Sequence, residues 1–212
     1  MKVDETTCWY EDERGPEQML LGAKGALWPV LEKSDHFPVL SELITIAQRD
    51  SFTLLDIGCG AAEVSRVYKN FYYTGVDLPN IIKEVAMKMH PHNSYISFDI
   101  YDENQDTSFI AEYDLIVMNA FIDVLERPVY GLEKVLTKAS KYVLIHRQTY
   151  HDEKETYLSK HPSYGGTSYQ SIINRNVFED LLKKYSFENV KELRLDYNPE
   201  IGYTSSILLR RK

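Results

Sequence analysis

Short apolar runs alternate along the chain with segments whose apolar residues recur at helical spacing. The runs are rich in β-branched and aromatic residues, and several are apolar at successive positions, which is typical of strands covered on both faces. The pattern predicts seven strands, over residues 52–58, 71–79, 94–100, 113–121, 142–150, 190–197 and 204–211. It also predicts five helices, over residues 38–50, 61–68, 80–90, 128–141 and 176–185.

The order of these elements indicates an α/β fold. Strands that alternate with helices are typical of a mostly parallel sheet with helices on both faces. The last two predicted strands are separated by the short segment "NPEIGY", which cannot contain a crossover helix. We therefore expect a C-terminal antiparallel hairpin at one end of a seven-stranded, mostly parallel sheet.

Residues 1–212 are predicted to form one domain, because no internal repeat, low-complexity tract or Pro/Gly-rich linker interrupts the chain. Its predicted parts are a helical cap (1–50), a ligand-binding core (51–150), a long crossover loop (146–174) and a final helix with the hairpin (175–212).

Charge and composition narrow the function classes. The 212 residues include 24 Lys and Arg and 32 Asp and Glu, a formal net charge of −8, which disfavours nucleic acid as a partner. No apolar run approaches the ~18 residues of a membrane-spanning helix, and the charged N-terminus lacks the apolar core of a secretory signal. Cys8 and Cys59 form no metal or disulfide pattern, so no metal is expected and a cytoplasmic location is predicted.

A glycine-rich turn follows the first predicted strand, in "TLLDIGCGAAEVSRVY". Gly58 and Gly60 have no Cβ, so the backbone can turn sharply there and approach a ligand closely. A dinucleotide site would favour a third glycine at position 63, but Glu63 stands there and would repel a pyrophosphate. The carboxylate of Asp56, two residues before the first glycine, would likewise repel a pyrophosphate. The turn therefore suits a ligand with a cationic amino group and a carboxylate.

Polar residues also end the next predicted strands, where the ligands of such sheets bind. Asp77 ends the second strand and can accept hydrogen bonds from both hydroxyls of a ribose. Asp99 ends the third and can accept from an exocyclic amine, while Ile100 and Leu78 can pack on the two faces of a flat base. Asn119 ends the fourth. We therefore expect an amino acid, a ribose and an adenine to bind in order across the sheet.

These residues resemble the motifs of the class I S-adenosylmethionine-dependent methyltransferases. The family's first motif, D/E-x-G-x-G-x-G, is matched by residues 56–62, with Ala62 in place of the third glycine. "GVDLP", "SFDIYD" and "YDLIVMNAFIDVLERP" (113–128) resemble the segments that follow, so that the resemblance covers roughly residues 50–150. Each motif alone could be an ordinary turn or helix cap; their joint placement at successive strand ends is what makes them specific.

The resemblance implies a Rossmann-like sheet and S-adenosylmethionine as methyl donor, with S-adenosylhomocysteine as product. The implied cofactor-binding residues are Asp56, Gly58, Cys59, Gly60, Asp77, Leu78, Asp99, Ile100 and Asn119. A fainter resemblance, over "LIHRQTY" and "SYQSIINRNVFEDLLKKYSFENV", is to the C-terminal part of uncharacterised bacterial methyltransferases linked to surface-polysaccharide genes.

The predicted crossover loop, residues 146–174, is long enough for a lid over an acceptor. His146, Arg147 and His151 are the catalytic candidates: a histidine can take a proton from a hydroxyl, and the arginine can bind a carboxylate or phosphate. The alternative is a solvated loop without a role in acceptor binding, whose tyrosines only pack against the protein. The segment also contains His161, Tyr150, Tyr157, Tyr164 and Tyr169.

The acceptor is expected to be a small molecule, for example a sugar or an aromatic ring, since tyrosines can stack on either. The N-terminal residues 9–28, with Trp9 and Tyr10, can fold over the same face or serve as a packing arm. The chemistry of the methylated atom stays open. Two other functions also stay open: an S-adenosylmethionine-binding module without turnover, and a nicotinamide-dependent oxidoreductase, which Glu63 disfavours.

Overall fold

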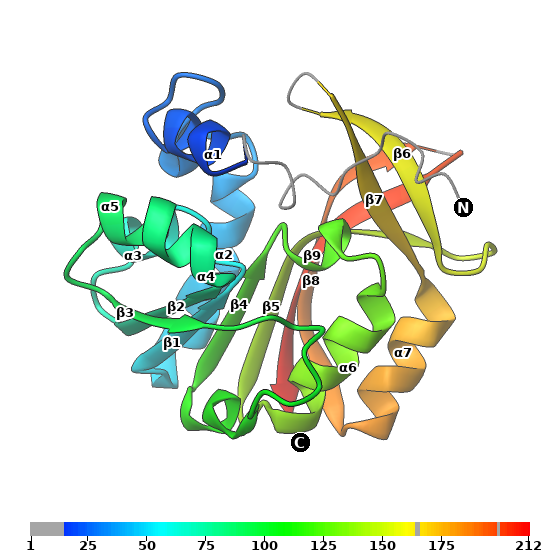
Figure 1. Ribbon diagram of the computed structural model, residues 1–212. Helices are drawn as coiled ribbons and strands as arrows, with labels where there is room; N and C mark the ends of the chain where they lie inside the picture. Colours follow the sequence, from blue (N-terminus) through cyan, green and yellow to red (C-terminus); the bar gives the residue numbers. More distant parts are fainter. Residues whose placement is uncertain (1–14, 164–165, 199) are drawn as a thin grey trace.

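The computed structural model describes residues 15–163, 166–198 and 200–212, and Figure 1 shows its twisted central sheet. The predicted α/β fold is confirmed, because all seven predicted strands are present and occur in the order β3-β2-β1-β4-β5-β9-β8. The first five of these are parallel, and β9 runs antiparallel to both β5 and β8. The seven strands are β1 (Thr53–Ile57), β2 (Tyr72–Asp77), β3 (Ser94–Ser97), β4 (Leu115–Asn119), β5 (Tyr142–His151), β8 (Phe187–Asn198) and β9 (Gly202–Arg211).

Helices cover both faces of this sheet, because successive residues of a strand point to opposite sides. Leu54 and Leu144 pack with the α2 residue Leu43 on one face, whereas Leu55 and Val143 pack with α6 and α7 on the other. The helices are α1 (Gly15–Ala23), α2 (Phe37–Ala47), α3 (Glu63–Val67), α4 (Pro79–Ile81), α5 (Met87–Met89), α6 (Pro128–Lys138) and α7 (Arg175–Lys184). A π-helical turn joins α4 to α5, and 3₁₀ turns lie at Leu31–Lys33, Gln48–Asp50, Ser108–Glu112 and Ile122–Val124.

The segment predicted as a crossover loop, residues 146–174, is not a loop. It contains the end of β5 and a β-hairpin of β6 (Tyr157–Ser163) and β7 (Gly166–Asn174), which stands above the sheet in Figure 1. Polar residues are frequent in both strands and Pro162 lies within one of them, so neither has the apolar run of a buried strand.

The hairpin occupies a defined place at the carboxyl edge of the sheet. β7 pairs in parallel with β5 at Thr149–His151, and β9 pairs with Thr149 and Tyr150 from the other side. β4 pairs with β5 on the same side as β7, opposite β9, and ends at Asn119. β7 therefore lies next to β5 where β4 has already ended. The hairpin therefore extends the sheet beyond the end of β4.

An irregularity in β5 separates the half that pairs with β4 from the half that pairs with β7. The register with β9 shifts between Ile145 and Gln148, and Arg147 has φ +67°, a left-handed conformation that is uncommon for a residue other than glycine. As a result His146 is buried, while the neighbouring Arg147 is exposed.

None of the helices in the described part of the chain is long and apolar enough to cross a bilayer.

Candidate functional site

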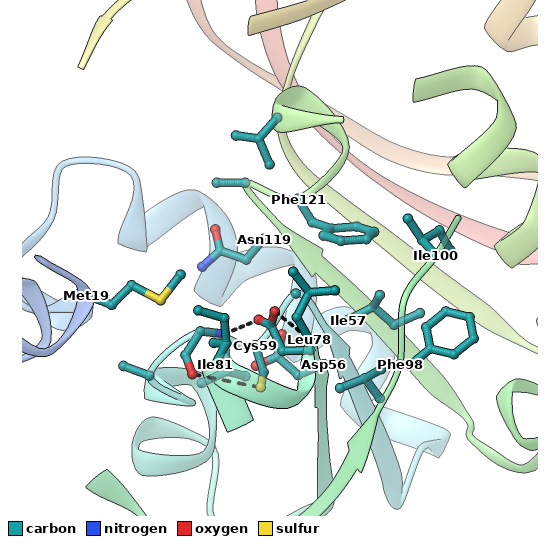
Figure 2. A pocket seen from close by; sticks show the side chains of 18 of the residues that line it. Met19, Asp56, Ile57, Cys59, Leu78, Ile81, Phe98, Ile100, Asn119 and Phe121 are labelled. Carbon is teal, nitrogen blue, oxygen red and sulfur yellow. Dashed lines mark hydrogen bonds between the residues drawn. The ribbon is translucent and has the colours of Figure 1, made fainter. Parts of the chain in front are cut away.

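A cavity of about 230 Å³ lies at the carboxyl ends of β1 to β4 (Figure 2). Met19, from α1, lies on one side of the cavity, and Phe98 and Ile100 lie on another. Ala23 and Trp28 also line it. The nine residues predicted to bind the cofactor all line this cavity: Asp56, Gly58, Cys59, Gly60, Asp77, Leu78, Asp99, Ile100 and Asn119. The structure thus brings them together, and their role in binding stays a prediction.

The glycine turn has the backbone conformation that excludes most other residues. Gly58 has φ +75° and Gly60 has φ +50°. A Cβ at Gly58 would lie 2.4 Å from the ring of Phe121, whereas a Cβ at Gly60 would meet only the sulfur of Met19, at 3.8 Å. Ala62, at the place of the family's third glycine, also has a positive φ, 57°. The turn is therefore closed by Phe121 at Gly58 and open to the cavity at Gly60.

Asp77 links the end of β2 to this turn. Its Oδ2 accepts a hydrogen bond from the Gly60 N–H at 2.8 Å, and its Oδ1 accepts from the Leu78 N–H at 2.8 Å. Burial raises the pKa of Asp77 to about 6, and the two backbone hydrogen bonds oppose this rise. Each carboxylate oxygen has a further lone pair, so the side chain can hold the turn and still accept from a ligand.

Asp56 is buried beneath the turn. Its Oδ2 accepts a hydrogen bond from the Tyr73 hydroxyl at 2.8 Å. Burial raises the pKa of Asp56 to about 7; the Tyr73 hydrogen bond opposes the rise and the charge of Asp77 adds to it. Burial, together with these two carboxylates, also raises the pKa of the Cys59 thiol, so this cysteine is protonated and unsuited to act as a nucleophile.

The raised pKa of Asp56 gives a testable pH dependence of stability. An acid whose folded pKa, about 7, lies above its usual 3.8 destabilises the fold progressively as the pH rises between these values. The Asp56→Asn variant cannot ionise there. Its free energy of unfolding should therefore increase relative to that of the native protein between about pH 4 and about pH 7, by up to about 4 kcal/mol.

Denaturant titrations across this pH range measure the effect, and Asp114→Asn serves as a control of opposite sign. Asp114 accepts hydrogen bonds from the backbone of Phe52 and Thr53, which with the charge of Lys141 lower its pKa despite burial. Removing this carboxylate should therefore reduce stability at higher pH. A pH-independent difference between Asp56→Asn and the native protein would contradict the buried, protonated Asp56.

The residues at the far end of the cavity form an apolar slot with a polar rim. Phe98 and Ile100 are buried, and Leu78 and Ile81 line the same cavity from the end of β2. Asp99 accepts a hydrogen bond from the Tyr101 N–H at 2.9 Å through Oδ1. The slot has the composition that a flat heterocycle requires, with apolar walls and an acceptor at the edge.

Asn119, at the end of β4, contributes an unpartnered acceptor to the cavity. Within the described residues its Oδ1 is buried without a hydrogen-bond partner. A buried polar atom without a partner is costly, so this atom is suited to accept from a ligand.

The three catalytic candidates do not line the cavity. His146 is buried between Ser206 and His36: its Nδ1 lies 2.7 Å from Ser206 Oγ and its Nε2 lies 2.9 Å from His36 Nδ1. Arg147 Nη1 lies 3.4 Å from His36 Nε2. His151 Nδ1 accepts from the backbone N–H groups of the turn that follows β5. The structure thus brings His146 and Arg147 together and places His151 elsewhere.

His36 was not predicted from the sequence, because no local pattern links it to strand ends far along the chain. Met19 and Trp28 belong to residues 9–28, the segment expected to fold over this face, although no pattern distinguishes them from their neighbours. Of the predicted tyrosines, Tyr150 is buried against Phe178 and does not line the cavity. The predictions for Trp9, Tyr10, His161 and Tyr164 fall on residues or side chains outside the described part of the structure.

Among the described residues, no group of three or more His, Cys, Asp or Glu side chains could hold a metal ion.

Solved structures of other proteins have the same fold. One is an amino pentose methyltransferase from Micromonospora echinaspora involved in calicheamicin biosynthesis, with S-adenosylmethionine bound; the TM-score is 0.59 at 11% identity, over 85% of this chain and 92% of that one. Another is an S-adenosylmethionine-dependent methyltransferase from Mesorhizobium loti, with a TM-score of 0.61 at 13% identity, over 85% of this chain and 100% of that one. The chain has the fold of the class I S-adenosylmethionine-dependent methyltransferases.

A third match extends over nearly the whole chain. The mitomycin 7-O-methyltransferase has a TM-score of 0.57 at 17% identity, over 99% of this chain and 62% of that one. No protein-family model and no curated protein sequence matches the chain. At identities of 11–17% this likeness is one of fold.

Proposed function

We propose that the protein binds S-adenosylmethionine in the cavity at the carboxyl ends of β1 to β4 and transfers its methyl group to a small-molecule acceptor. The observation that carries this proposal is the convergence of the glycine turn, Asp77, Asp99 and Asn119 on one cavity. These residues belong to separate strands, and only a ligand that extends across the sheet would contact all of them.

Each part of the donor has suitable residues in this cavity. The open side of Gly60 accommodates the amino-acid part, where the unpartnered Oδ1 of Asn119 can accept from its ammonium group. Asp77 can accept from the ribose hydroxyls through its remaining lone pairs. The slot between Leu78 and Ile100 suits the adenine, and Asp99 can accept from its exocyclic amine.

A bound sulfonium donor supplies an electrophilic methyl group with a good leaving group. The protein then has to align the acceptor with the methyl carbon and exclude water. Met19 and Trp28 cover the cavity from the N-terminal segment, and Phe121 covers the glycine turn. The position of Met19 and Trp28 supports the proposal that the N-terminal segment excludes water from the cavity.

The acceptor is proposed to approach from the side of β4 and β5, because the proposed donor-binding residues other than Asn119 lie at the ends of β1 to β3. There the 3₁₀ turn after β4 packs against β7, and Ser171 Oγ donates to the Ile122 carbonyl at 2.8 Å. The cited neighbours include methyltransferases of an amino pentose and of mitomycin. A sugar or a ring system is therefore the proposed acceptor class for this chain, and the surface-polysaccharide resemblance is compatible with a sugar.

Isothermal titration tests the donor. S-adenosylmethionine and S-adenosylhomocysteine are expected to bind with a stoichiometry of about one, and NADH should give no binding heat, because Glu63 also lines the cavity and would repel a pyrophosphate. Folded protein that binds neither adenosyl compound would rule out the proposal. Donor binding without S-adenosylhomocysteine formation over a broad acceptor panel would instead favour a binding module.

A further inference from the structure

His36 and His146 form a hydrogen-bonded pair next to the end of β4, on the side from which the acceptor is proposed to approach. His36 comes directly before α2, and His146 lies in β5 opposite Asn119 of β4. The two rings have centroids 5.1 Å apart. The Ala120 N–H donates to the His146 carbonyl at 3.1 Å, so that the pair adjoins a residue of the cavity wall.

The protonation of this pair follows from its partners. An arginine side chain only donates hydrogen bonds, so Arg147 Nη1 donates to His36 Nε2. A neutral His36 must then hold its proton on Nδ1 and donate it to His146 Nε2, 2.9 Å away. A neutral His146 in turn holds its proton on Nδ1 and donates to Ser206 Oγ, 2.7 Å away. The chain of hydrogen bonds therefore has one direction, from Arg147 through both histidines to Ser206.

Both histidines are neutral near neutral pH. Burial, followed by the charge of Arg147, lowers the pKa of His36 to about 4, and the charge of Asp35 opposes this. Burial, followed by His36 and Arg147, lowers the pKa of His146 well below its usual 6.5. A neutral imidazole has an available lone pair, which a base requires.

Arg147 has a second partner available nearby. Within the described residues Asp123 Oδ1 is buried without a hydrogen-bond partner; burial raises the pKa of Asp123 to about 6, and the charge of Arg147 opposes this rise. The contact from Arg147 to His36 is long, at 3.4 Å. A shift of Arg147 onto Asp123 would satisfy the carboxylate and expose His36 Nε2 to an acceptor, while removing a cation that disfavours protonated His36.

We propose that His36 is the base for a hydroxyl acceptor, and that His146 and Ser206 are positioning residues that hold it in the reactive tautomer. This deepens the proposed function and rests on it. The acceptor oxygen forms its bond to the methyl carbon, the carbon–sulfur bond breaks, and its electron pair stays on sulfur. The hydroxyl proton goes to His36 Nε2, and the resulting imidazolium donates from Nδ1 to His146. The acceptor class is then an alcohol or a phenol, and the reaction is an O-methylation.

The tautomers can be measured without donor or acceptor. In protein labelled with ¹⁵N-histidine, His36 and His146 should both carry the proton on Nδ1, although free neutral histidine favours Nε2. In an Arg147→Leu variant, His146 alone should keep the proton of His36 on Nδ1, and adding His146→Leu to it removes this acceptor, so that His36 should return to the Nε2 form. A purely structural His146 would not change the tautomer of His36. An Nε2-protonated His36 or His146 in the native protein would overturn the proposal.

Turnover tests the base. His36→Gln is suitable because the His36 side chain is only half-buried and makes no capping hydrogen bond to α2. With S-adenosylmethionine and a panel of phenols and glycosides, we expect kcat to fall at least about a hundredfold, while the Kd for S-adenosylhomocysteine stays within about threefold. His92→Gln, at an exposed histidine just before β3, is the matched control and should behave as the native protein.

The outcomes separate this inference from the proposed function. Native turnover rates in His36→Gln would overturn the role of His36 while donor binding stands. The same conclusion would follow if the native protein methylated only amines and thiols, or no hydroxyl acceptor at all. Loss of donor binding in the native protein would overturn the proposed function itself, and the tautomers of the pair would still be measurable.

Discussion

The variant Gly60→Val should have no measurable affinity for S-adenosylhomocysteine and should still fold. A Cβ at this position would meet only Met19 Sδ, at 3.8 Å, so a branched side chain has room and would extend into the cavity. It would occupy the space proposed for the amino-acid part of the donor. The positive φ of +50° adds strain of about 1–3 kcal/mol, which lowers the melting temperature without abolishing the fold.

Gly25→Val is the matched control for this strain. Gly25 has φ +75°, and its Cβ would lie 3.5 Å from Val30 Cγ1, but it does not line the cavity. Isothermal titration should show native affinity in the Gly25 variant and no binding in the Gly60 variant. Native binding by Gly60→Val would mean that the turn does not face the donor, and an equal loss in both variants would assign the effect to strain alone.

The second large effect is expected at Asp77. Asp77→Ala removes the acceptor proposed for the ribose hydroxyls, and hydrogen bonds to charged groups contribute ~1.5–3 kcal/mol. The affinity for S-adenosylhomocysteine should therefore fall by about ten- to a hundredfold. The variant also leaves the Gly60 and Leu78 N–H groups without their acceptor, so its melting temperature should fall as well.

Asp77→Asn separates the two roles of this side chain. The amide keeps an oxygen for one of the two backbone N–H groups, so most of the stability should return, while the lost charge keeps the affinity below that of the native protein. Titration and thermal unfolding of both variants measure the difference. If Asp77→Ala binds with native affinity, the ribose lies elsewhere. Because Gly60 and Asp77 share a hydrogen bond, their combined effects should not be additive.

The central sheet is predictable because its signals are local. Runs such as residues 115–118 are apolar at successive positions, and the helix signals between such runs follow from spacing alone. The candidate donor site follows from topology. Gly58, Asp77 and Asn119 are far apart in the sequence, yet each follows or ends a parallel strand, and parallel strands end at the same edge of a sheet.

The hairpin of β6 and β7 has no comparable signal. Its strands extend the sheet where β4 has ended, and their pairing with Thr149–His151 depends on the space that the shorter β4 leaves. A segment with a proline and many polar residues is indistinguishable from a loop until this edge exists. The register shift at Arg147 separates the half of β5 that pairs with β4 from the half that pairs with β7. This shift is likewise a property of the assembled sheet.

The sequence pattern is sufficient for the α/β fold, for seven of its strands and for nine of the residues that line the candidate donor cavity, since period and strand ends are properties of neighbouring residues. The histidine pair required the tertiary structure. His146 was a candidate base on its own, but its partner His36 lies 110 residues earlier in the chain, and its tautomer depends on Arg147 and Ser206. A side chain's protonation and accessibility are set by atoms that only the folded chain brings within hydrogen-bonding distance.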